Sequence, residues 1–99
     1  MGQIQISSPS LKSLTHSETS VTTSPTQVLA PLATAAKRVI VLVQNKSTSV
    51  NISVVGNSTD TVGIIVPPLS NISIDNYNGG IWAFADSGTV TVHVATSVV

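Results

Sequence analysis

Few side chains in this sequence are of the types that catalyse reactions or bind metals. The chain of 99 residues contains two histidines, His16 and His93, four acidic residues and no cysteine. The three aspartates precede or lie within turn-forming runs, where an aspartate hydrogen-bonds to nearby backbone: Asp60, Asp75 and Asp86. The sequence spacing does not give either histidine an acidic partner that would indicate catalysis. His93 is therefore expected to be an exposed cross-strand neighbour on the last strand.

Motifs for enzymatic chemistry are missing from the sequence. No serine lies in a nucleophile-elbow pattern, and no glycine string resembles a phosphate-binding loop. The oxygen donors of Asp75, Asn76 and Asn78 are too sparse to indicate a calcium site. We therefore predict no catalytic, cofactor-binding or metal-binding residues, and we interpret the chain as a protein that is not an enzyme.

Low charge and short apolar runs exclude two classes of partner, nucleic acids and membranes. Four basic residues balance four acidic ones, and only 8% of the chain is charged, so no basic stripe is available for nucleic-acid phosphates. The longest apolar run, residues 39–43, is too short to span a bilayer. The N-terminus lacks a basic region followed by an apolar one, so we expect no signal peptide.

Short β-branched runs separated by turn residues extend from Lys37 to the C-terminus. The runs are KRVIVLVQN, SVNISVVG, TVGIIVPP, SNISID, GGIWAFAD and GTVTVHVAT. Alternation of apolar and polar residues within several of them is typical of strands with one buried face. The pattern predicts an all-β fold: a single antiparallel β-sandwich or jelly-roll-like barrel of about 7–8 short strands, with an extended N-terminal arm.

The N-terminal fifth differs in composition from the rest. Residues 1–20 are rich in Ser, Thr and Gln, whereas residues 21–99 carry the strand pattern, so we divide the chain into an arm and a β-sandwich domain at this point. A disordered tail is one interpretation. The other rests on the alternation of Gln3, Ile4, Gln5 and Ile6, which could add a strand to a neighbouring chain. In an assembly we favour this contact arm.

One predicted strand is apolar on both faces. Residues 39–43 (VIVLV) do not alternate, so this strand is either central and covered on both sides or located at a subunit interface. We assign the interface to Val39, Val41 and Val43. Because a small core without cysteine often relies on self-association, we expect a homo-oligomer.

Aromatic side chains are limited to Tyr77, Trp82 and Phe84. Trp82 and Phe84 share one face of their strand. As the large side chains of a small protein, the three are expected to fill the core. The alternative is a ligand platform of Tyr77 and Trp82, with polar groups from the turn at residues 75–80.

Two stretches resemble a recurrent pattern in small tailed-phage virion proteins. In AAKRVIVLVQNKSTSVNISV, Arg38 opens a strand that ends in Gln44 and Asn45. IIVPPLSNISIDNYNGGIWAFADSGTVTVHV is similar to the second half of that pattern, with matches at Gly80, Ile81, Trp82, Ala83, Ser87, Gly88, Val92 and Val94. The resemblance covers residues 26–95. It departs at Pro67-Pro68, where the pattern usually carries a Pro-Gly or Ala-Gly turn.

This resemblance implies a virion component. Members of the group resemble capsid cement or decoration proteins, head fibres and tail-associated modules. We therefore expect a protein that is made in the host cytoplasm and stabilises the outer capsid surface. Its expected partners are the major capsid protein and itself, with a trimer favoured, and neither nucleic acid nor membrane. The alternative is a receptor- or glycan-binding module of a fibre or tail.

Overall fold

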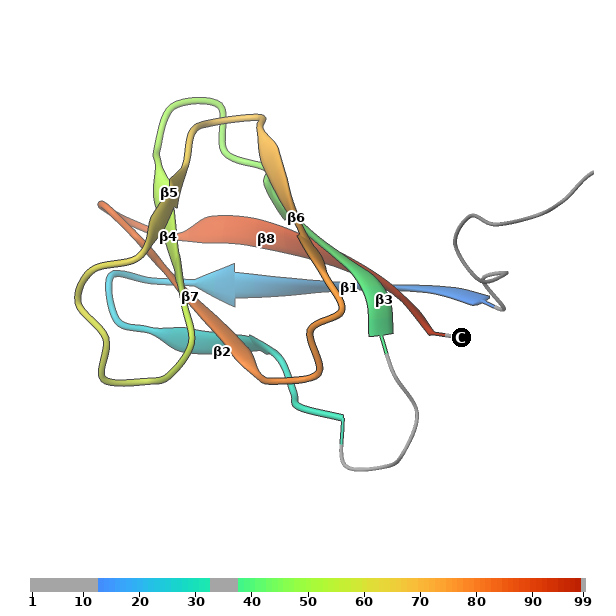
Figure 1. Cartoon of the computed structure of the whole chain (residues 1–99). Helices are drawn as coiled ribbons and strands as arrows, with labels where there is room; N and C mark the ends of the chain where they lie inside the picture. Colours follow the sequence, from blue (N-terminus) through green and yellow to red (C-terminus); the bar gives the residue numbers. More distant parts are fainter. Residues whose placement is uncertain (1–12, 33–37, 99) are drawn as a thin grey trace, which may run out of the picture.

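The computed structural model describes residues 13–32 and 38–98, which form eight strands and no helix (Figure 1). The strands are β1 (Ser13–Val21), β2 (Thr26–Leu29), β3 (Arg38–Asn45), β4 (Ile52–Val55), β5 (Ile64–Val66), β6 (Asn71–Asp75), β7 (Ile81–Ala85) and β8 (Val90–Val98). Within these residues no helix is long and apolar enough to cross a membrane.

The strands form two antiparallel sheets of four. Sheet A has the order β1-β8-β3-β6, and sheet B has the order β2-β7-β4-β5. Buried side chains of both sheets, such as Val43 of β3 and Ile52 of β4, belong to one hydrophobic cluster. The prediction of an all-β fold is confirmed, and the arrangement is compatible with a sandwich.

Alternating side chains explain which faces enter the core. In β7, Ile81, Ala83 and Ala85 are buried while the intervening aromatic residues are partly exposed. In β8, Val92 and Val94 are buried because consecutive side chains of a strand point to opposite faces. The outward position of His93, between these two valines, agrees with the expectation for the last strand, whereas β7 buries the face opposite to the one expected.

Part of the segment that was predicted to be an arm is a strand of sheet A. Residues 13–20 were assigned to the arm, but they belong to β1, which pairs with β8 from Ser13↔Val98 to Val21↔Val90. Figure 1 shows the two strands side by side. The sequence analysis missed this strand because the segment is rich in Ser and Thr and its apolar alternation is weak. Pairing with β8 stabilises it as a strand.

A buried asparagine links the two sheets. Asn45, at the end of β3, is fully buried, and its Nδ2 donates to the carbonyl oxygens of Val50 (2.8 Å) and Val66 (2.9 Å). Its Oδ1 accepts a hydrogen bond from the backbone N–H of Ser47 (2.9 Å). Each polar atom of this side chain is paired, so its burial does not leave an unsatisfied group.

Candidate functional site

The outer face of sheet A carries a chain of polar contacts centred on Glu18. Oε2 of Glu18 lies 2.7 Å from Nζ of Lys46 and 3.1 Å from Nδ1 of His93. The hydrogen bond from Lys46, with a second from His93, lowers the pKa of the Glu18 carboxyl below its usual value. The carboxyl group is therefore ionised at neutral pH and acts only as an acceptor.

The second ring nitrogen of His93 contacts the other histidine. Nε2 of His93 lies 2.9 Å from Nδ1 of His16, and the two ring centroids are 5.0 Å apart. Ionised Glu18 accepts a hydrogen bond from Nδ1–H of His93, which leaves Nε2 of the same ring to face His16. One of these two facing nitrogens carries the hydrogen of the contact.

Strand register produces this cluster. In the β1–β8 pair, Glu18 is opposite His93 and His16 is opposite Ala95, so the two histidines are diagonal neighbours on the same face. The sequence analysis had placed His16 in the arm. It correctly expected His93 to face outward but missed its partners, which are 75 and 77 residues away in the chain.

A shallow hollow of about 280 Å³ adjoins the histidine pair. The small side chain of Ala95 lies between those of larger neighbours on β1 and β3, which leaves this depression in the sheet surface. The residues that line it are His16, Leu42, Gln44, Asn71, His93 and Ala95. Within 13–32 and 38–98, no group of three or more His, Cys, Asp or Glu side chains is arranged to hold a metal ion.

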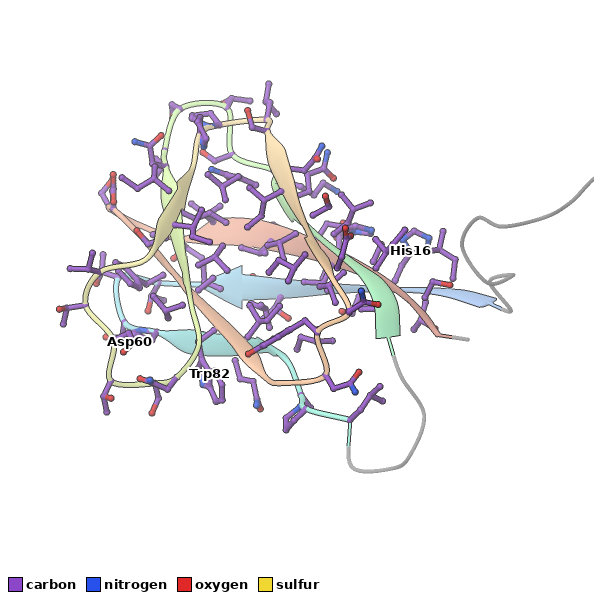
Figure 2. All side chains as sticks on the ribbon, viewed as in Figure 1. His16, Asp60 and Trp82 are labelled. Carbon is purple, nitrogen blue, oxygen red and sulfur yellow. The ribbon has the colours of Figure 1, made fainter. Side chains whose placement is uncertain are left out.

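The outer face of sheet B is aromatic. Trp82 and Phe84 lie on this face and are only partly buried, so the expectation that they fill the core is wrong for both. The core of this sheet is filled by β-branched and alanine side chains instead. Figure 2 shows Trp82 and Asp60 in a different part of the molecule from His16.

Phe84 lines a second hollow, of about 230 Å³. Its other lining residues come from the β1–β2 turn (Thr23 and Pro25) and from the β4–β5 connection (Asp60 and Thr61). An aromatic ring, hydroxyl groups and a carboxylate therefore border one open depression. Such a combination suits a polyhydroxylated ligand, which offers both C–H faces and hydrogen-bonding groups.

The fold separates Tyr77 from Trp82, which were predicted to form one ligand platform. Tyr77 packs against the hydrophobic core, and its hydroxyl donates to the carbonyl oxygen of Gly80 (2.7 Å). Trp82 instead lies on the outer face. Its indole ring is so close to Gly80 that a Cβ atom added at this glycine would come within 2.8 Å of the ring. Phe84, two residues along the same strand, is the aromatic neighbour of Trp82 on that face.

The predicted subunit interface is also corrected. Val41 and Val43 are fully buried in the core of the single chain, so their side chains are not available to a partner. The outward neighbour Leu42 retains 36% of its exposure. The side chain of Val39 and the predicted arm contacts, Gln3, Ile4, Gln5 and Ile6, lie outside the described residues.

Exposed apolar side chains concentrate in another place, at the edge of sheet B. Val62, Ile64, Ile65 and Leu69 are 85%, 55%, 62% and 64% exposed. They lie in or beside β5, which is an edge strand in the described sheet. We call residues 62–69 the β5 edge segment. It contains no charged residue, although charges commonly protect exposed edges against pairing with other chains.

Leu69 has an unfavourable backbone conformation as well as an exposed side chain. Its φ is 58°, in the left-handed region that costs a non-glycine residue about 1–2 kcal/mol. The N–H of Leu69 donates to the carbonyl oxygen of Ser47, and that of Ser70 donates to Pro67, which holds the turn.

Comparison with known proteins adds no relative: no family model matches the chain, and no curated protein matches it.

Proposed function

We propose that this chain is a structural virion protein of the capsid cement type, which binds the outer surface of a phage shell as a homo-oligomer. The observation that carries the proposal is the β5 edge segment, with four exposed apolar side chains and no charge. A strand edge of this kind is suited to pairing with another chain. The resemblance of residues 26–95 to small virion proteins supports the same role.

Leu69 strengthens the argument for an interface. An exposed leucine in the left-handed region adds strain without contributing to the core, and such residues concentrate at functional positions. In the proposed assembly, Leu69 and the β5 residues contact a second copy, with a trimer favoured. The arm residues 3–6 and the jelly-roll-like wrapping of the chain belong to the same proposal. Linked copies then hold the shell through many weak contacts.

The test measures oligomeric state and shell binding of the full chain. We expect sedimentation velocity to give an oligomer and co-sedimentation to show binding to shells of the major capsid protein. Ile65→Lys should dissociate the oligomer, because it places a charge on the paired edge. The matched control is Leu14→Lys, which alters an equally exposed apolar residue on β1 and should leave the oligomer intact. A wild-type chain that is monomeric and does not bind shells at any salt concentration would contradict the proposal.

A second candidate function is a glycan-binding module of a fibre or tail. The specific observation that favours it is the hollow beside Phe84, with Asp60, Thr61 and Thr23 at its border. In this alternative, sugar C–H groups stack on the aromatic ring and the carboxylate accepts hydroxyl hydrogen bonds.

A glycan array followed by a binding titration tests this alternative. Phe84→Ala and Asp60→Asn should each abolish detectable binding of a hit, whereas Asp86→Asn, an exposed carboxylate of another turn, should not. An array without hits, or hits that survive both substitutions, would eliminate this site.

A further inference from the structure

The histidine pair on the outer face of sheet A is independent of the proposed assembly contacts. We propose that His16 and His93 form a two-imidazole site for a divalent transition-metal ion such as Zn²⁺, with Glu18 as a positioning residue. The site lies on strands β1 and β8, whose nine-residue pairing holds both side chains on one face. Imidazole nitrogen is a preferred ligand of Zn²⁺, Ni²⁺ and Cu²⁺.

The distance between the facing nitrogens fits a shared metal after a small movement. They are 2.9 Å apart, and two imidazole nitrogens on one tetrahedral Zn²⁺ at its usual bond length are separated by about 3.3 Å. His16 is exposed and lies on an edge strand, so its ring can rotate without disturbing the core. The metal takes the place of the proton that the two nitrogens share.

Glu18 determines which nitrogen of His93 faces the metal. In the neutral ring, which is the form that binds a metal, the carboxylate accepts the Nδ1–H of His93 at 3.1 Å and the lone pair lies on Nε2. A carboxylate on the far side of a ligating histidine is the usual arrangement in metal sites, where it orients the ring and raises its basicity. His16 binds through Nδ1 in the neutral tautomer that carries its hydrogen on Nε2.

The remaining coordination positions are open to water. The hollow beside the pair has a volume of about 280 Å³ and is bordered by the amide groups of Gln44 and Asn71. No third His, Cys, Asp or Glu completes the set within the described residues. Lys46 neutralises Glu18, so the metal gains no net attraction from charge. Two protein ligands and water make this a site of modest affinity.

The experiment is a Zn²⁺ titration of the full chain at about pH 8, where imidazole is ordinarily neutral, monitored by NMR. Because the chain has only two histidines, their C2–H signals report both ligands directly. We expect both signals to shift together with a Kd below about 1 mM. His16→Gln and His93→Gln should each weaken binding at least tenfold, and Glu18→Gln should weaken it by about 10–100-fold.

The controls separate this site from general cation binding. Asp86→Asn should bind Zn²⁺ as the wild type does, and Mg²⁺, which prefers oxygen ligands, should shift neither histidine signal. Amide spectra of each variant establish that it is folded. Histidine signals that do not respond to Zn²⁺, or a response confined to one histidine, would overturn the two-imidazole site. An unchanged affinity in Glu18→Gln would overturn the positioning role.

Discussion

The outer faces of the two sheets differ in chemistry. Sheet A contains every ionisable side chain that lies in a described strand, including His16, Glu18 and His93. The strands of sheet B, with the sequences TQVL, ISVV, IIV and IWAFA, contain no charged residue and no histidine. Their outer surface includes partly buried aromatic rings and an exposed apolar edge.

This difference separates two kinds of binding within one small fold. A polar face can hold an ion through directed contacts, and its interactions weaken as salt screens them. An uncharged edge associates through backbone pairing and apolar burial, which are much less sensitive to salt. In our proposals, sheet A therefore carries the metal site and sheet B carries the contacts with other chains.

The largest expected effect comes from breaking the link between the sheets. Asn45→Leu should lower the free energy of unfolding by roughly 2–4 kcal/mol, because two buried carbonyl groups lose their donor. Chemical denaturation of the purified chain measures the loss. The exposed Asn57 is the control, and Asn57→Ala should cost clearly less. Equal losses in the two variants would show that Asn45 does not link the sheets.

A smaller effect, of opposite sign, is expected at the edge of sheet B. Leu69→Gly should stabilise the monomer by about 0.5–1 kcal/mol, because the relief of left-handed strain exceeds the entropy that glycine adds to the unfolded chain. The same change should weaken self-association by removing an exposed apolar side chain. Denaturation at low concentration and sedimentation measure the two effects separately. A less stable monomer would show that Leu69 contributes to folding rather than to contact.

The smallest effect is expected on the polar face. Lys46→Gln should raise the pKa of Glu18 toward its usual value, because its hydrogen bond is the main cause of the lowered pKa. Ionised Glu18 favours the folded state above that usual pKa, and this contribution disappears as the pH falls through the folded-state pKa. NMR titration of the carboxyl group measures the shift. An unchanged pKa would mean that the ion pair is absent in solution.

Local pattern was sufficient to predict much of the fold. The period of two in residues 81–85 and 90–94 identified which side chains share a face of β7 and of β8, because a strand with one buried face must alternate. The aromatic residues were assigned to the wrong side of their own strand. Size suggested the core, but the buried positions of β7 are occupied by Ile81, Ala83 and Ala85, which belong to the hydrophobic cluster.

The candidate sites were beyond prediction from local pattern. The spacing of His16 and Glu18 puts them on one face of a strand, but nothing local brings His93 to them, because that contact depends on the register of β1 against β8. Similarly, Asp60 reaches the hollow beside Phe84 only through the path of the β4–β5 connection. Non-local pairing is a property of the whole sheet, so no window of sequence contains it.

By itself, the sequence determined that the chain is all-β, poor in charge and poor in catalytic side chains, because composition and period-two alternation are local properties. Only the tertiary structure decided that residues 13–21 join a sheet and that Val41 and Val43 are interior. It also decided that the polar cluster and the apolar edge lie on different sheets. These outcomes depend on which strands pair and which faces meet, and pairing is decided by burial across the whole chain.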